Sequence, residues 1–285
     1  MTDIREQAIR LYDAYTHEHL DRRRLLREVT ALAGSAAAAE TLILGIAASP
    51  AAAQITPAND PRLVIRREEG TLAGQPALAY NATLKDRRKR FGTVVVVHEN
   101  RGLNAHTEDV ARQVALAGFN AVAPDFLAPQ GGTPKDENAA REMIGQADYD
   151  RVIAQAMAYL RRAPGGAGMV GFCWGGGLVN RVAVAAGPAL AAGVSYYGPA
   201  PDPAEAAKVQ APLMIHLAGN DARVNKTAEP WIAALEAAGK RVEAHTYPGA
   251  EHAFNNDTST ERYNSQSATL AWKRTTAFLR RELDG

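Results

Sequence analysis

The chain has one cysteine, Cys173, and it lies in the segment GFCWGGG at positions 171–177. An apolar run precedes this segment, and the residues from Trp174 to Ala186 have the composition of a helix. The pattern Gly-x-Cys-x-Gly is typical of a nucleophile elbow, in which a strained residue stands at the tip of a sharp strand-to-helix turn. A buried structural cysteine beside a glycine bend is the alternative interpretation.

A cysteine in this position has the surroundings that thiol chemistry needs. The first backbone N–H groups of the following helix are aimed at the group that the side chain attacks, and they stabilise a thiolate and an oxyanion alike. The thiolate is the nucleophilic form of cysteine. Because Cys173 has no second cysteine to join, the chain forms no intrachain disulfide and no cysteine-based metal cluster. We expect neither a metal nor a cofactor.

A thiol nucleophile needs a base, and the base needs an acid that fixes its tautomer. His252 lies in the loop PGAEHAF at 248–254, just after the last predicted strand, and is the best-placed base. Asp221 follows the predicted strand at 213–217 and is the best-placed acid, although a turn aspartate that caps the next helix is the alternative. His98 also ends a strand, but it precedes the nucleophile and no acid is positioned to orient it. The chain order nucleophile, acid, histidine is that of α/β-hydrolase folds.

The elements that must position these side chains alternate between strand and helix from Arg62 onward. This order predicts a mostly parallel central sheet with helices on both faces, because parallel strands need crossover helices. Chemistry in such sheets gathers at the carboxyl ends of the strands. The strands are expected at 63–67, 77–84, 93–97, 120–123, 193–197, 213–217 and 242–247, with the first two antiparallel, and a further strand is expected in the apolar run from Met169 that leads to Cys173. The helices are expected at 107–117, 149–162, 174–186, 226–238 and 267–283.

Residues 1–56 differ in composition from the catalytic domain expected at 57–285. Apolar residues at helical spacing predict an amphipathic helix from Ile4 to His19. A basic segment, an alanine-rich stretch and a small-residue end then follow, as in a twin-arginine export signal, although charged residues interrupt the apolar run and no stretch is long enough to cross a bilayer stably. Two interpretations stay open: an export signal, which implies a periplasmic protein, or a retained helical arm in a cytoplasmic protein. Such an arm packs on its own domain or on a second copy of the chain.

The near-neutral charge of the chain favours a small molecule bound in a pocket over a charged macromolecular partner. The net charge is +1 at pH 7, which gives no electrostatic argument for nucleic acid or for an anionic membrane. The basic run KDRRKR at 85–90 is interpreted as a solvated loop, with a nucleic-acid patch as the alternative. We therefore expect a small-molecule substrate and no nucleic-acid partner.

Several of these motifs together resemble the dienelactone hydrolase (carboxymethylenebutenolidase) family. They are GFCWGG at 171–176, GND at 219–221, GAEHAF at 249–254, PD at 124–125 and HENRG at 98–102. The resemblance covers about residues 63–283 and implies an α/β-hydrolase fold with Cys173, Asp221 and His252 as the triad. It also implies that Glu99 holds the resting thiol neutral until substrate displaces the carboxylate. The oxyanion donors implied are the backbone N–H groups of Asn100 and Trp174.

The chain departs from the family at the residues that hold the substrate. Family members bind the substrate's carboxylate with two arginines, one in the loop after the Pro-Asp pair and one four places beyond the histidine. Here that loop is FLAPQ at 126–130, and Asn256 occupies the second position. Arg101 is the candidate replacement, with pairing to Glu99 or to another nearby acid as its alternative.

Aromatic side chains are expected around this site. Trp174, Tyr197 and Phe254 are predicted to line the pocket, with ordinary packing as the alternative. The polar stretch 130–148 is long enough to act as a lid or to be a surface excursion.

The sequence thus predicts a cysteine-dependent hydrolase of a lactone or ester. One alternative is a general carboxylesterase or thioesterase acting on an uncharged acyl group, which the missing arginines favour. Comparing a lactone that carries a carboxylate with its methyl ester separates these two. The other alternative is a non-catalytic ligand-binding relative in which Cys173 is inert, and labelling with iodoacetamide distinguishes it.

Overall fold

The structure is a computed structural model that describes residues 3–17, 20–47, 55–86, 91–163 and 166–284. Two expectations fall partly outside these residues: the small-residue end of the export signal, at 49–54, and the basic positions 87–90. The α-helices and strands are α1 (Ile4–His17), α2 (Arg22–Ala33), α3 (Ala36–Ile46), β1 (Leu63–Leu72), β2 (Gln75–Leu84), β3 (Thr93–Val97), α4 (Ala105–Leu116), β4 (Asn120–Pro124), α5 (Glu137–Gly145), α6 (Tyr149–Arg162), β5 (Ala167–Phe172), α7 (Trp174–Ala185), β6 (Leu190–Tyr196), β7 (Leu213–Ala218), α8 (Ala222–Ala237), β8 (Val242–Tyr247) and α9 (Ser265–Leu283).

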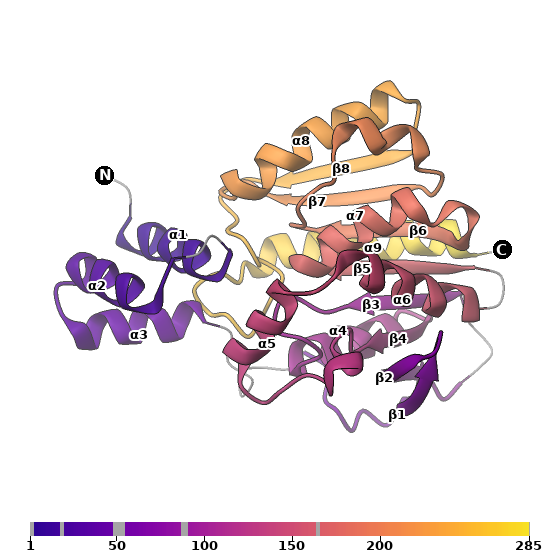
Figure 1. Cartoon of the computed structure of the whole chain (residues 1–285), viewed down its shortest axis with the longest axis horizontal. Coiled ribbons are helices and arrows are strands. Elements are labelled where there is room, and N and C mark those ends of the chain that lie inside the picture. Colours follow the sequence, from indigo (N-terminus) through magenta and orange to yellow (C-terminus); the bar gives the residue numbers. More distant parts are fainter. Residues whose placement is uncertain (1–2, 18–19, 48–54, 87–90, 164–165, 285) are drawn as a thin grey trace.

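The strands form one eight-stranded sheet in the order β1-β2-β4-β3-β5-β6-β7-β8 (Figure 1). The strands from β3 to β8 are mutually parallel, while β2 pairs antiparallel with both β1 and β4. The prediction of a mostly parallel sheet with an antiparallel first pair is therefore confirmed.

Two hydrophobic clusters lie on opposite faces of this sheet. The side chains of β3 alternate between them, so that Val95 and Val97 belong to one cluster while Val94 and Val96 belong to the other. The first cluster is completed by α6, α7 and α8, and the second by α4 and α9. A run of four buried valines is what a central strand covered on both faces requires. The carboxyl ends of the strands are left open for loops.

Helix boundaries differ from the sequence prediction where a side chain caps the helix. Helix α8 begins at Ala222 rather than at Lys226, because the side chain of Asp221 accepts a hydrogen bond from the backbone N–H of Val224 and starts the helix earlier. The polar stretch 130–148 contains α5, which the sequence analysis did not predict.

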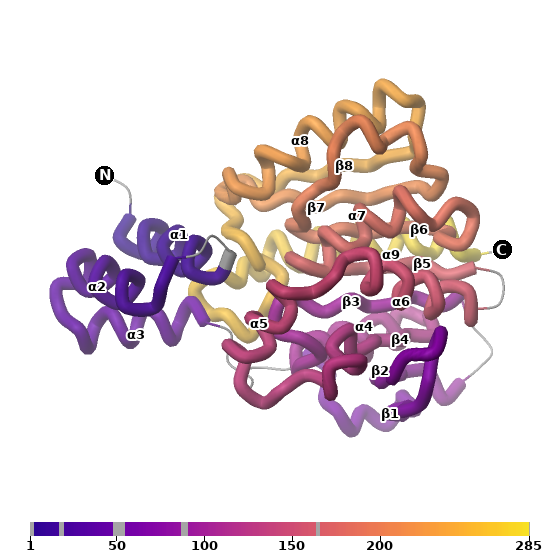
Figure 2. The backbone as a smooth tube through the Cα atoms, in the orientation of Figure 1, coloured from indigo at the N-terminus to yellow at the C-terminus, as the bar shows by residue number. Residues whose placement is uncertain are grey.

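The N-terminal helices α1, α2 and α3 form a compact three-helix unit at one end of the molecule, beside the loop that precedes α9 (Figure 2). The predicted amphipathic helix is present as α1. The unit has its own small hydrophobic core, which includes Ile9, Leu25 and Val29. Among the described residues, no single helix has the length and apolar character needed to span a membrane; α2 and α3 meet that test only as a pair, and they are bent by 112°.

Candidate active site

Cys173 stands at the tip of a strained turn between β5 and α7. Its backbone has φ 54° and ψ −114°, a conformation that is costly for a residue with a side chain. A Cβ atom added at Gly171 would lie 2.2 Å from the carbonyl oxygen of Gly175. One added at Gly175 would lie 2.5 Å from the carbonyl oxygen of His98. Only glycine fits at these two positions, and the turn therefore has the geometry of a nucleophile elbow.

The structure brings the three predicted triad residues into one hydrogen-bonded line. The His252 Nε2 atom lies 3.1 Å from the Cys173 sulfur, and the opposite ring nitrogen, Nδ1, lies 2.5 Å from Asp221 Oδ2. All three side chains are buried, with exposed fractions of 5% for Cys173, 2% for His252 and 6% for Asp221. A base within reach of a nucleophile and an acid behind the base is the arrangement that activates a nucleophile.

Each of these three residues follows a parallel strand at the carboxyl edge of the sheet. Cys173 follows β5, Asp221 follows β7 by a short turn, and His252 lies in the loop after β8. The residue after the histidine, Ala253, has φ 65°, in the left-handed region that favours glycine. The sheet order places β5, β6, β7 and β8 side by side, so that these three loops meet.

Charge at the site favours a protonated imidazole. Burial alone lowers the pKa of His252, but the neighbouring Cys173 sulfur and the Asp221 carboxylate outweigh burial and raise that pKa to about 10. For Asp221, burial raises the pKa, but the charge and hydrogen bond of His252 outweigh it and hold the pKa below its ordinary value. The imidazole ring thus lies between two groups, the Cys173 sulfur and the Asp221 carboxylate, that favour its protonated form.

Glu99 is held beside this line by two hydrogen bonds. The Tyr197 hydroxyl donates to Glu99 Oε1 over 3.3 Å, and the Asn256 side-chain amide donates to Glu99 Oε2 over 2.9 Å. Like Cys173 and Ala253, Tyr197 has a positive φ, of 38°, in the region that favours glycine. Glu99 and Cys173 line the same small cavity. Asn256, the residue that replaces a family arginine, thus fixes the carboxylate of Glu99.

The two predicted oxyanion donors, the backbone N–H groups of Trp174 and Asn100, come from separate elements. Trp174 is the first residue of α7, where a backbone N–H has no partner within the helix. Asn100 lies after β3 and lines the cavity with Cys173. The indole of Trp174 stacks on the His98 ring, with centroids 5.3 Å apart, and so packs in the core. The His98 ring accepts a hydrogen bond from the Phe126 N–H, and its other nitrogen, Nδ1, lies 2.7 Å from the carbonyl oxygen of Glu99, whereas Nδ1 of His252 faces a carboxylate.

The predicted substrate-binding residues have mixed surroundings. Phe254 is fully buried against Tyr197 and Tyr247, and it does not line the cavity at Cys173. Arg101 does line the cavity, but its guanidinium pairs with Glu137 and donates to the Tyr12 hydroxyl.

Sequence reasoning missed Arg262. This side chain is 7% exposed and lines the same cavity as Cys173, and its Nη1 atom lies 3.3 Å from Asp13 Oδ1. It is the first cation after His252 in the sequence, which is a weak signal. Its approach to the site depends on a turn at Ser259, whose hydroxyl accepts a hydrogen bond from Arg262 Nε over 3.0 Å. No pattern in the sequence predicts that turn.

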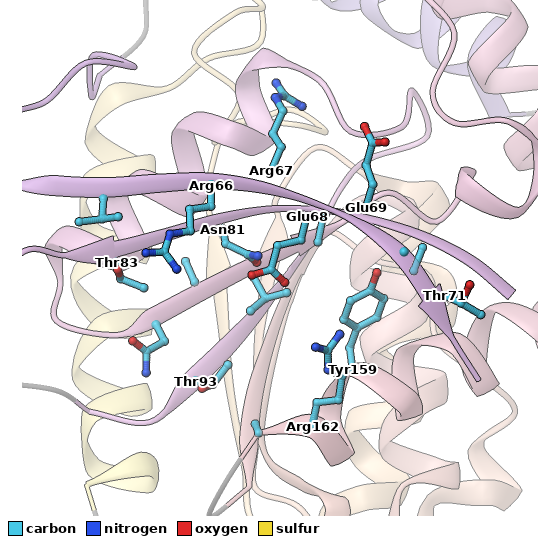
Figure 3. A pocket seen from close by; sticks show the side chains of 18 residues that line it. Arg66, Arg67, Glu68, Glu69, Thr71, Asn81, Thr83, Thr93, Tyr159 and Arg162 are labelled. Atoms are coloured by element: carbon cyan, nitrogen blue, oxygen red, sulfur yellow. The ribbon is translucent and has the colours of Figure 1, made fainter. Parts of the chain in front are cut away.

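The cavity at Cys173 is small, with a volume of about 10 Å³. That volume holds about one water molecule. A much larger hollow of about 720 Å³ lies elsewhere, between the β1–β2 hairpin, the first residues of β3 and β4, and the C-terminal part of α6 (Figure 3). Arg66, Asn81, Tyr159 and Arg162 are among the residues that line it, and none of the triad residues does.

The sheet, the elbow and the order of the three residues define an α/β-hydrolase. Comparison with known proteins narrows the class. The model of the dienelactone hydrolase family matches residues 78–283, which is more than half of the chain. The chain therefore belongs to the dienelactone hydrolase family and is a hydrolase.

Individual relatives agree with this assignment. A protein of Methylorubrum extorquens named "Putative carboxymethylenebutenolidase" is 30% identical over 274 residues, which cover 88% of this chain and 94% of the relative. A crystal structure from Klebsiella pneumoniae named "Putative Dienelactone Hydrolase" is 28% identical, with a TM-score of 0.67 over 76% of this chain and 98% of that one. The dienelactone hydrolase of Anabaena variabilis shares the fold at 18% identity, with a TM-score of 0.62 over 78% of this chain and 99% of that one.

Proposed function

We propose that the protein is a cysteine-dependent hydrolase of a lactone or ester, with Cys173, His252 and Asp221 as the catalytic triad. The observation that carries this proposal is the continuous contact from sulfur to imidazole to carboxylate, 3.1 Å and 2.5 Å long, at the tip of a strained elbow. Strain of this kind persists only where the surrounding structure enforces it, and it clusters at functional sites.

The reaction begins when His252 accepts the proton of the Cys173 thiol and the thiolate attacks the carbonyl carbon of the substrate. The carbonyl oxygen becomes an oxyanion, which the backbone N–H groups of Trp174 and Asn100 stabilise. Collapse of this intermediate breaks the bond to the alkoxide, which leaves with the proton from His252. A thioester on Cys173 remains. In a lactone, the departing hydroxyl stays attached to the acyl group.

Water completes the cycle. His252 accepts a proton from water, the hydroxide attacks the thioester carbonyl, and collapse of the second oxyanion releases the carboxylic acid and restores the resting Cys173–His252 pair. Asp221 keeps Nδ1 of the ring protonated throughout and stabilises the imidazolium that forms twice per turnover. The products are one acid and one alcohol, or one hydroxy acid from a lactone.

Glu99 acts before substrate arrives. A carboxylate beside the sulfur disfavours the thiolate, so Glu99 limits unproductive reactions of Cys173 in the resting state. Its two hydrogen bonds, from Tyr197 and Asn256, hold it at that place. Substrate that enters between Glu99 and the sulfur separates the two groups.

The charges around the cavity favour the second candidate, a carboxylesterase or thioesterase for uncharged acyl groups. Each guanidinium at the cavity already faces a carboxylate: Arg101 pairs with Glu137, and Arg262 with Asp13. Glu99 adds a further carboxylate. An anionic substrate would meet this excess of negative charge, whereas a neutral acyl group would not.

The two candidates are separated by a lactone that carries a carboxylate and by the methyl ester of that same lactone. The neutral compound should be hydrolysed with a kcat/KM higher by about tenfold or more. The guanidinium groups of Arg101 and Arg262 are already paired with carboxylates, so they do not offset the cost of desolvating the carboxylate of the anionic compound. Initial rates for both compounds at equal ionic strength give the ratio. A preference for the carboxylate form would show that Arg101 or Arg262 leaves its partner to bind substrate, and would contradict the neutral-acyl candidate.

A further inference from the structure

The three-helix unit of α1, α2 and α3 is joined to the rest of the molecule by polar contacts, although its interior is apolar. Its hydrophobic core is separate from the two clusters of the sheet. Arg5 forms an ion pair with Glu261, 2.9 Å from Nε to Oε2, and the Ser259 hydroxyl donates to the carbonyl oxygen of Ile46 over 2.6 Å. On the other side, Arg141 of α5 donates to the carbonyl oxygen of Tyr15 over 2.6 Å. The unit is therefore an independently packed body held on the domain at its edges.

Helix α1 places its own side chains in the active site. Tyr12 and Thr16 line the cavity together with Cys173 and His252. Between them on the sequence, Asp13 lies against Arg262, and the Arg262 guanidinium is also 5.5 Å from the centre of the Tyr12 ring. Helix α1 thus forms the roof of the cavity, and its Asp13 carboxylate pairs with the buried guanidinium of Arg262 beside Cys173 and His252.

The roof leaves too little room for a substrate. The volume of about 10 Å³ at Cys173 compares with several hundred Å³ for pockets that enclose a small organic ligand. The sulfur itself belongs to a residue that is only 5% exposed. A lactone or ester reaches the sulfur only if something above it moves, and α1 is the element that carries the roof without sharing the core of the sheet.

We propose that the three-helix unit is a lid over Cys173, latched by Asp13 on Arg262, and that it must lift before a substrate can reach the sulfur. The consequence for catalysis rests on the proposed function, whereas the motion itself does not. The Asp13–Arg262 pair is the inner contact of the lid, and the pair Arg5–Glu261 and the contact Tyr15–Arg141 are its outer anchors. Lifting breaks polar contacts, which water replaces, and it leaves the three hydrophobic clusters intact.

The outer anchors allow the lid to be loosened without touching the catalytic machinery. The Arg5 and Glu261 side chains are 42% and 35% exposed, so replacing Arg5 disturbs no core. Arg141 lies over the Tyr15 ring, 4.3 Å from its centre, and it too stands outside the cavity. Arg24 provides a matched control, because its ion pair with Glu28 lies entirely within α2.

The test measures how fast iodoacetamide alkylates Cys173 in the full chain. The reagent is small and uncharged, and Cys173 is the sole cysteine, so mass spectrometry of the intact protein reports this one site. The rate follows the fraction of molecules with the lid lifted. We expect an increase of about two- to fivefold in each of Arg5→Gln and Arg141→Gln, about tenfold in the double variant, and no change in Arg24→Gln.

The alkylation rate of the wild-type chain at low and high salt tests the lid without any substitution. Raising sodium chloride from 0.05 M to 0.5 M screens the half-exposed Arg5–Glu261 pair and should speed alkylation about twofold or more. Melting temperatures of the variants establish that they remain folded. Equal alkylation rates for the wild type at low salt, the wild type at high salt and the double variant would contradict the lid proposal.

Failure of the lid is distinguishable from failure of the proposed function. If Cys173→Ala abolishes ester hydrolysis while the anchor variants alkylate at the wild-type rate, the lid is wrong and the catalytic proposal stands. If the anchor variants alkylate faster while Cys173→Ala still hydrolyses esters, the lid stands and the nucleophile is wrong.

Discussion

Replacing Cys173 with alanine should lower kcat for ester hydrolysis by a factor of about 10⁴ or more. The alanine removes the only atom that forms the acyl-enzyme, and loss of the nucleophile from such a triad leaves only oxyanion stabilisation and substrate positioning. Because the change removes a single heavy atom from a turn fixed by Gly171 and Gly175, the elbow should survive. Steady-state hydrolysis of aryl esters and thioesters by both chains measures the loss.

Ser195→Ala is the matched control for this loss. Ser195 is a buried residue of β6 whose hydroxyl donates to the Gly176 carbonyl oxygen over 3.0 Å and accepts from the Asn180 side-chain amide over 3.3 Å. Its alanine variant also loses one heavy atom near the turn, and its kcat should stay within about tenfold of wild type. A large loss in Ser195→Ala together with activity in Cys173→Ala would assign the chemistry to a hydroxyl.

Asp221→Asn should lower kcat/KM by a factor of about 10³ to 10⁴, since the amide no longer fixes the tautomer that leaves Nε2 facing the sulfur. The variant should also change the pH dependence. Asp221 is one of the groups that raise the pKa of His252, so its removal lowers that pKa. The imidazolium then loses its proton at a lower pH, and the alkaline limb of the kcat/KM profile should move towards neutrality. Profiles from pH 6 to pH 10.5 measure both effects.

Glu251→Gln controls for the loss of a buried negative charge near the histidine. Glu251 precedes His252 in the chain and is 7% exposed, but its carboxylate accepts a hydrogen bond from Asn220 rather than from the imidazole. We expect kcat/KM within about threefold of wild type and an unmoved alkaline limb. An equal effect of the two substitutions would mean that Asp221 acts only through its general charge and does not position the ring.

The sequence predicted the fold and the three residues that meet at the elbow because both depend on local patterns. A run of valines such as that of β3 is expected in any central strand that is buried on both faces of a parallel sheet. Glycines at 171 and 175 are required by any strand-to-helix turn as sharp as the one at Cys173. Asp221 and His252 were found because each follows a strand, and the parallel arrangement brings strand ends together. Rules of this kind need no knowledge of side-chain packing.

The surroundings of the triad were not predictable in the same way. Asp13 is separated from Arg262 by 249 residues, and the contact depends on how a separate three-helix unit sits on the domain. Arg101 was expected either to bind substrate or to pair with an acid. In the structure Arg101 pairs with Glu137 of α5, a helix that the sequence pattern did not predict within the polar stretch 130–148. Contacts between elements far apart in sequence are set by packing, and no periodicity records them.

The central claim is that Cys173 becomes acylated during turnover, and the most direct measurement is the mass of the enzyme stopped in mid-reaction. The protein is mixed with excess aryl ester or thioester, quenched in acid within milliseconds and digested for mass spectrometry. The peptide that contains Cys173 should be heavier by one acyl group, the label should be lost under hydroxylamine, and Cys173→Ala should carry none. An acyl group on any other residue, or product release with Cys173 unmodified at every time point, would contradict the account.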